Sequence, residues 1–128
     1  MSEILFEDLF THYGKRAYLH KLTDTKEVSG LNGRPTTAPD QPSDYIVTLD
    51  GETFFAEVKS SEGATSFPFK NIRPSQYRGA RQQLAVGGTY LFYILRTKTG
   101  AWFRVPAKVI LEWPRKSMTW VELEPYRI

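Results

Sequence analysis

Residues 43–59 read Ser-Asp-Tyr-Ile-Val-Thr-Leu-Asp-Gly-Glu-Thr-Phe-Phe-Ala-Glu-Val-Lys. Two runs in this stretch, Tyr45 to Leu49 and Glu52 to Lys59, are rich in the β-branched and aromatic residues that favour strands. Between them stands Asp50-Gly51, a strong signal for a two-residue hairpin turn. The stretch therefore predicts an antiparallel β-hairpin in which Leu49 pairs with Glu52.

This register brings charged side chains together at the open end of the hairpin. Counting back from the turn, Asp44 lies opposite Glu57, roughly 5 Å away between Cβ atoms, where two carboxylates repel each other. Because side chains alternate between the two faces of a strand, Lys59 shares a face with Glu57, and alternate residues from Phe54 to Val58 face an apolar layer. Two carboxylates and an ammonium group are therefore predicted to converge.

The predicted cluster suits a hard divalent cation. Mg²⁺ takes one or two carboxylates, keeps several waters and accepts phosphate oxygens as its remaining ligands, so we expect Asp44 and Glu57 to bind Mg²⁺, with Mn²⁺ as a substitute. Lys59 would orient or deprotonate the attacking water, or stabilise the charge that builds on a phosphate. The alternative is a surface strand with an ordinary Glu/Lys pair, because short motifs give many false positives.

Two motifs carry a resemblance to a known family. Asp44, followed by Glu57-Val58-Lys59, resembles the D…(D/E)xK core of the PD-(D/E)XK nuclease superfamily. Thr65-Ser66-Phe67-Pro68-Phe69-Lys70-Asn71, with a helix after it, is similar to the longer and more specific segment that follows this core in RecU-type Holliday junction resolvases. With Phe6-Glu7-Asp8, the resemblance touches most of positions 4–106. In one departure, Pro42-Ser43-Asp44 has a serine before the aspartate.

The resemblance implies a fold and a set of site residues. The fold would be α/β (α+β), with a mixed β-sheet flanked by helices and the αβββαβ core of restriction endonucleases. The Val58 carbonyl and a glutamate from the first helix would join the metal ligands, and Gln76 would contact the scissile region. Glu7 is preferred to Glu3 because it lies nearer the buried edge of that helix. The alternative is a solvated acid favoured by the helix dipole.

We therefore expect a metal-dependent, structure-selective DNA endonuclease that resolves four-way (Holliday) junctions by paired phosphodiester hydrolysis. The resemblance also implies a homodimer that binds branched DNA. Two alternatives stay open. One is a duplex DNA endonuclease of the restriction or repair type with the same core, and the other is a catalytically inactive DNA-binding module of the same fold.

Composition limits the alternatives. A chain of 128 residues predicts a single domain, residues 1–128, and its 41% hydrophobic and 14% aromatic content is that of a globular protein. The absence of cysteine excludes disulfides, thiolate zinc sites and a cysteine nucleophile. His12 and His20 lack the spacing of metal ligands. With no apolar run long enough for a membrane span and no signal peptide, we expect no membrane contact and a cytoplasmic place in a bacterial or phage-infected cell.

The formal charge is only +3, so a DNA-binding surface must come from local clustering. The densest cluster of cations falls where no acid occurs between Gly63 and Glu112, and it predicts contacts with backbone phosphates. Its members are Lys70, Arg73, Arg78 and Arg81. The alternative is a solvated charged face. Lys15 and Arg16 form a second basic pair that is also predicted to bind DNA.

The remaining elements follow from periodicity and turn residues. Helices are predicted over 3–13, with Ser2 as N-cap, over 74–86 and over 107–113. Strands are predicted over 17–22, 89–95, 101–105 and 118–123, and a polar loop over 60–71. Residues 23–41 lack periodicity and are predicted to be either a projecting functional loop or a linker. Because a small domain has difficulty burying 3 Trp, 7 Tyr and 8 Phe, the first helix and Trp102, Trp113 and Trp120 are predicted to form the dimer interface.

Overall fold

The structure is a computed structural model that describes residues 2–22 and 41–128. Its elements are α1 (Ser2–Asp8), η1 (Thr11–Arg16), β1 (Ala17–Lys21), β2 (Tyr45–Leu49), β3 (Glu52–Ser61), β4 (Ser66–Pro68), η4 (Phe69–Asn71), α2 (Pro74–Ala85), β5 (Tyr90–Arg96), β6 (Ala101–Pro106), α3 (Ala107–Leu111), β7 (Ser117–Thr119), α4 (Trp120–Leu123) and η5 (Glu124–Tyr126). The predicted fold class, a mixed sheet flanked by helices, is confirmed.

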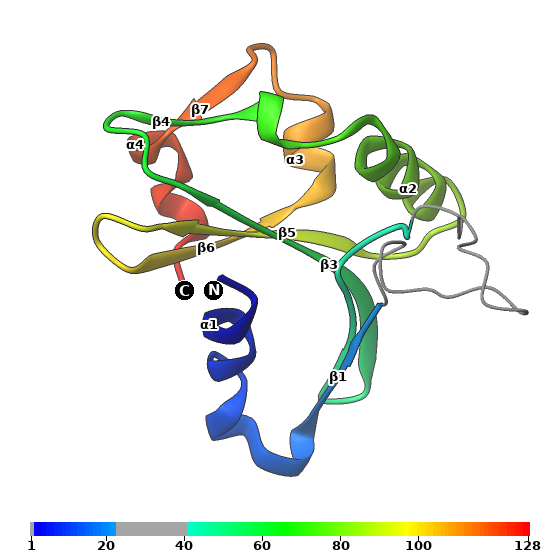
Figure 1. The fold of residues 1–128 in the computed structure, drawn as a ribbon. Coiled ribbons are helices and arrows are strands. Elements are labelled where there is room, and N and C mark those ends of the chain that lie inside the picture. The colour runs from blue at the N-terminus through cyan, green and yellow to red at the C-terminus, as the bar shows by residue number, and fades with distance from the viewer. Residues whose placement is uncertain (1, 23–40) are drawn as a thin grey trace, which may run out of the picture.

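A five-stranded sheet in the order β1-β2-β3-β5-β6 forms the middle layer. Helix α1 covers one face, and α2 and α3 cover the other together with the small β4-β7 sheet and α4 (Figure 1). All neighbouring strands run antiparallel except β3 and β5, which are parallel and connected through α2. This crossover places the start of α2 over β3.

The predicted hairpin is confirmed in its register. Leu49 pairs with Glu52, and Tyr45 pairs with Ala56. Asp50 and Gly51 form the turn with φ angles of 51° and 85°, the left-handed conformation that a primed hairpin turn requires and that aspartate and glycine tolerate.

Two separate hydrophobic cores fill the two faces of the sheet. Phe54, Ala56 and Val58 of β3 face an apolar layer, as predicted, and this layer is the core that contains Phe6 of α1. The strand predicted over 89–95 is β5, and it is buried on both faces. Tyr93 and Leu95 enter that same core, and its alternate residues pack under α2 and α3. The two cores explain how a small chain buries many aromatic rings.

The expected exposure of the tryptophans is wrong in two cases. Trp102 and Trp120 are only 7% and 5% exposed, one in each core. Trp113 is half-buried, and its Nε1 donates a hydrogen bond to the Ser117 carbonyl at 2.9 Å. Since these rings are used inside the chain, a dimer interface cannot be assigned from tryptophan content.

The first helix is shorter than predicted. Ser2, predicted as the N-cap, is the first residue of α1, and the α-helix ends at Asp8. Leu9 N then donates to the Phe6 carbonyl, and Phe10 N to the Glu7 carbonyl, both at 3.1 Å, which is the tighter 3₁₀ pattern. The apolar periodicity continued into this stretch and concealed the change of helix type.

Two predictions of local structure are wrong. Residues 60–71 are not a loop throughout, because β3 continues to Ser61 and β4 pairs with β7, with Phe67 fully buried. The strand predicted over 118–123 ends at Thr119, which is the N-cap of α4. Glu122 N donates to Thr119 Oγ1 and Thr119 N donates to Glu122 Oε1, both at 3.0 Å, so a capping box starts a helix there.

The predicted projecting loop over 23–41 lies outside the described residues except for Gln41. The single domain over 1–128 stays a prediction. Within residues 2–22 and 41–128, the structure has no helix that combines the length and the apolar character of a membrane span.

Candidate active site

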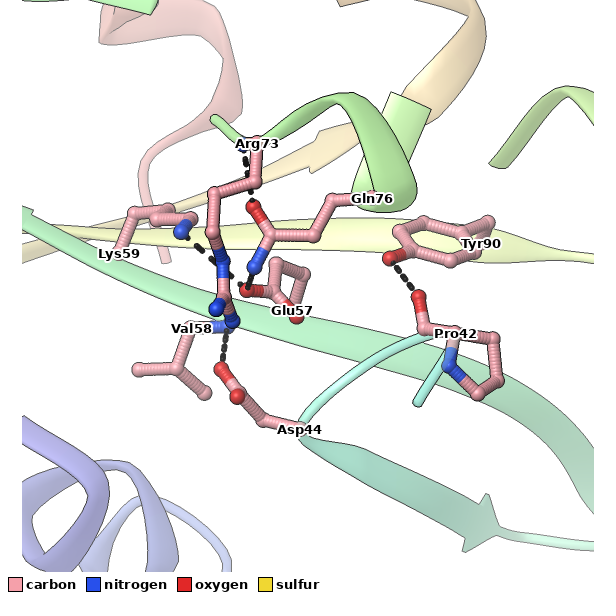
Figure 2. A network of polar contacts seen from close by, with 8 residues as sticks. All are labelled: Pro42, Asp44, Glu57, Val58, Lys59, Arg73, Gln76 and Tyr90. Carbon is pink, nitrogen blue, oxygen red and sulfur yellow. Dashed lines mark hydrogen bonds and ion pairs between the residues drawn. The ribbon is translucent and has the colours of Figure 1, made fainter. Parts of the chain in front are cut away.

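The hairpin register brings Asp44 and Glu57 to neighbouring positions at the open end of β2 and β3 (Figure 2). Asp44 Oδ2 accepts a hydrogen bond from the Val58 backbone N at 2.9 Å. The Asp44 carbonyl accepts from Leu22 N at 2.8 Å, which ties the residue to the end of β1. The pair predicted from the sequence is therefore brought together by the backbone of three strands.

The two oxygens of Glu57 have different surroundings. Oε2 accepts a hydrogen bond from Gln76 Nε2 and lies 3.3 Å from Lys59 Nζ. Gln76 is itself oriented, because its Oε1 accepts from the Arg73 backbone N at 2.8 Å at the start of α2. Oε1 of Glu57 is buried and has no hydrogen-bond partner among the described residues. A buried carboxylate oxygen without such a partner is unusual in a folded protein and marks a place where a cation or a water can bind.

Burial and nearby charges raise the pKa of both carboxyl groups. Burial, and then the negative charge of Asp44, raises the pKa of Glu57 to about 8, although Lys59 and Arg73 oppose this shift. Burial is also the first cause that raises the pKa of Asp44, and the Val58 N–H opposes it. The positive charges of Lys59 and Arg73 thus do not offset the burial of Glu57 and its repulsion by Asp44, and a bound cation would favour the ionised carboxylates.

The donor atoms fit a hard divalent cation. The free Oε1 of Glu57 and the carboxylate of Asp44 supply oxygen ligands. The N–H and C=O of one strand residue point to the same side, so the Val58 carbonyl is directed to the edge at which its N–H meets Asp44. No group of three or more acidic, histidine or cysteine side chains suited to a metal occurs in the described ranges. Two carboxylates are the number that Mg²⁺ commonly uses.

The acids of α1 are arranged differently from the sequence-based preference. Glu7 Oε2 accepts a hydrogen bond from the Tyr45 hydroxyl at 2.6 Å, and the structure does not bring it into a group with Asp44 and Glu57. Glu3, which pairs with Lys21 at 2.7 Å, is the helix acid whose charge contributes to the raised pKa of Asp44, after burial. The helical face alone could not separate the two, because both lie on neighbouring turns.

The basic cluster surrounds the start of α2. Lys70, Arg73, Arg78 and Arg81 are all exposed, and none forms an ion pair with an acid in the described part of the chain. Arg73 lies nearest to the carboxylates, since its charge lowers the pKa of Glu57 and its side chain extends beside that residue in Figure 2. The cluster thus borders the acidic pair.

Lys15 and Arg16 are not brought to this site. Arg16 Nε and Nη2 donate to the two carboxylate oxygens of Asp50 at 2.7 Å each. This ion pair lies at the hairpin turn, the opposite end of β2 from Asp44. The DNA-binding role of the pair stays a prediction, and the charge of Arg16 is already balanced.

Sequence reasoning gave no role to Tyr90, whose hydroxyl donates a hydrogen bond to the Pro42 carbonyl beside the acidic pair (Figure 2). Tyr90 opens β5, and its approach to Pro42 depends on the parallel pairing of β3 with β5. That pairing cannot be read from residue spacing. A tyrosine in an apolar run gave no signal beyond burial.

No protein-family model matches the chain, and no curated protein matches its sequence. Among solved structures, the chain is similar to Hjc of Archaeoglobus fulgidus, a Holliday junction resolvase from an archaeal hyperthermophile, with a TM-score of 0.59. The fold is that of an archaeal resolvase. The two sequences are 11% identical, and the match covers 99% of this chain and 89% of that chain. This likeness concerns the fold, and the RecU-type resemblance stays a prediction.

Proposed function

We propose that this protein is a metal-dependent DNA endonuclease that cuts four-way junctions. The observation that carries the proposal is the convergence of Asp44, Glu57 and Lys59 at the open end of a hairpin. Two features support it within the described residues: Glu57 Oε1 has no hydrogen-bond partner, and the exposed cations around α2 form no ion pair with an acid. The resolvase fold of the Hjc neighbour favours branched DNA as the substrate.

Each side chain has a role that follows from its position. Asp44 and Glu57 would hold one or two Mg²⁺ ions with the Val58 carbonyl, and Glu7 or Glu3 of α1 would be a further acid. When bound, Mg²⁺ would lower the pKa of a water and neutralise charge on the scissile phosphate. Lys59, held beside Glu57 and mostly buried, would orient the attacking water or stabilise the negative charge of the transition state. Gln76 fixes the orientation of Glu57.

A nicking assay tests the proposal and its rivals together. The substrates are a four-way junction, a nicked duplex and a linear duplex of the same sequence, each with Mg²⁺, with Mn²⁺ and with EDTA. We expect metal-dependent paired cuts in the junction and little cleavage of the linear duplex. Equal cleavage of all three substrates would favour a duplex endonuclease. Binding of DNA without any cleavage in either metal would favour an inactive module.

The cations around α2 should bind phosphates without reading sequence. We predict that Arg78→Ala or Arg81→Ala each lowers the slope of log affinity against log salt by roughly 0.9 for the junction, because one phosphate contact is lost. Fluorescence anisotropy over a salt series measures this slope. The control is Lys98→Ala, which removes an exposed cation in the turn between β5 and β6. An equal loss of slope in all three variants would contradict the specific placement of the DNA on α2.

We also propose a homodimer, because two ligatable products need cuts in two strands and the described residues bring Asp44, Glu57 and Lys59 together at one place. A closed two-fold dimer would present two clusters in a symmetric relation to a junction. Light scattering should give twice the mass of one chain at working concentration. A monomer mass both for the free protein and for its junction complex would rule this assembly out.

A further inference from the structure

Asp44 depends on the short segment before β2 for its position. It precedes the strand, so its side chain is not fixed by the pleat of the sheet alone. Ser43 Oγ donates to the Tyr45 carbonyl at 2.8 Å, and Leu22 N donates to the Asp44 carbonyl. These contacts hold the two residues next to the strand. The peptide before them, at Pro42, is held from the other side of the site.

Tyr90 supplies the first contact with Pro42. Its side chain is 1% exposed, and its hydroxyl donates to the Pro42 carbonyl. The pKa of this phenol is raised, first by burial and then by the charges of Glu57 and Asp44. The hydroxyl therefore stays protonated at every working pH and remains a donor close to both carboxylates.

Gly79 supplies the second contact. This residue lies in α2, and a Cβ built on it would stand 3.0 Å from the Pro42 carbonyl oxygen and 3.2 Å from the Pro42 Cα. Only glycine allows the helix to approach the Pro42 peptide this closely without a shift. Gly79 lies one turn after Gln76, which bonds to Glu57. One face of α2 thus touches the chain next to both carboxylates.

We propose that Tyr90 and Gly79 clamp the Pro42 peptide and so position Asp44 beside Glu57 for metal binding. The inference rests on the proposed function only where it says that Asp44 binds a metal, because the clamp itself consists of contacts within the chain. Tyr90 and Gly79 touch neither substrate nor metal in this assignment. They are positioning residues that act through the backbone of residues 42–44.

Hydrogen exchange tests the clamp without any metal or DNA. The Val58 N–H is protected by Asp44 Oδ2, so its exchange rate reports whether Asp44 stays in place. In Tyr90→Phe we expect this amide to exchange about tenfold faster in the native state, as for one lost hydrogen bond. The matched control is Tyr93→Phe, on the same strand, whose side chain belongs to the core on the α1 face of the sheet, whereas Tyr90 belongs to the core under α2. In Tyr93→Phe, the exchange rate of the Val58 amide should stay within about twofold of the rate in the unchanged protein.

Metal affinity provides a second readout, measured by calorimetry with Mn²⁺ alone. We expect about tenfold weaker binding in Tyr90→Phe, a typical loss when the support of a metal ligand is removed, and no change in Tyr93→Phe. Gly79→Ala should weaken Mn²⁺ binding as well, although alanine favours the helix, so the loss cannot be attributed to a weakened α2. Asp44→Asn, which removes one of the two carboxylates, gives the baseline for Mn²⁺ binding outside the site.

The two readouts separate the clamp from the proposed function. If Val58 exchange is the same in Tyr90→Phe and Tyr93→Phe, the clamp is wrong, whatever the metal result. If the unchanged protein binds no Mn²⁺ through Asp44, the proposed function fails, and the exchange rates still decide the clamp. Faster Val58 exchange with weaker Mn²⁺ binding in both Tyr90→Phe and Gly79→Ala supports both.

Discussion

Asp44→Asn, Glu57→Gln and Lys59→Ala are each expected to lower the cleavage rate of a four-way junction in Mg²⁺ by about 10³-fold. Affinity for the same junction in EDTA should change by less than about threefold, because exposed cations supply most of the binding. The reason is the geometry of the cluster. The two carboxylates are the ligands for a cation, and Lys59 is held 3.3 Å from Glu57 in a mostly buried position.

Single-turnover cleavage at saturating protein measures the chemical step apart from binding. The matched control is Glu62→Gln, which removes an exposed acid just beyond β3 and should cleave at the normal rate. Loss of a carboxylate should also tighten metal-free binding slightly, since a negative charge leaves the phosphate path. Normal cleavage by any of the three site variants would contradict the assignment of that residue.

The hairpin was predictable because its information is local. Asp50-Gly51 fixes the turn, the turn fixes the register of Tyr45–Leu49, and this register brings residue 44 next to Glu57. The face shared by Glu57 and Lys59 follows from alternation, and the structure confirms it with their contact. Two of the main features of the candidate site therefore required no tertiary information.

Other features depend on contacts between distant segments. Gln76 reaches Glu57 only because α2 crosses back over β3, and its role came from the family resemblance and not from any spacing. Which glutamate of α1 could join the metal ligands, Glu3 or Glu7, depends on which turn of α1 packs beside Asp44. The clamp on Pro42 combines a strand and a helix residue that no local pattern connects.

Two local errors have a different cause. Thr119 and Glu122 form a capping box that is visible in the sequence, but the aromatic and β-branched residues beside them favoured a strand. Most of residues 60–71 are polar, and this composition concealed Phe67 and Phe69. Both are buried in the core under α2 and α3. In both places a short, specific signal was outweighed by average composition.

Stability of the metal-free protein should fall as pH rises from 5 to 8, because of Glu57. Its pKa is about 8 in the folded protein, against 4.5 for an unperturbed glutamate. The folded state therefore keeps a proton that the unfolded chain loses over this range. When the folded state binds more protons, the free energy of unfolding decreases with pH. The stabilisation that the retained proton on Glu57 gives to the folded state is complete below about pH 4.5 and is lost as the pH rises toward 8.

The expected decrease is about 3.5 kcal/mol between pH 5 and 8, because the folded state keeps close to one extra proton over most of this range, at about 1.4 kcal/mol for each pH unit. Glu57→Gln keeps an oxygen that can accept from Gln76 and removes the titrating group, so this variant should be more stable than the unchanged protein at pH 8 and nearly equal to it at pH 5. Urea unfolding in EDTA at both pH values measures the difference, with Glu62→Gln as the control that keeps the slope. Added Mg²⁺ should restore stability at pH 8 to the unchanged protein but not to Glu57→Gln, because a ligand stabilises only the state that binds it. If the unchanged protein and Glu57→Gln lost the same stability from pH 5 to 8 in EDTA, the raised pKa of Glu57 would be contradicted.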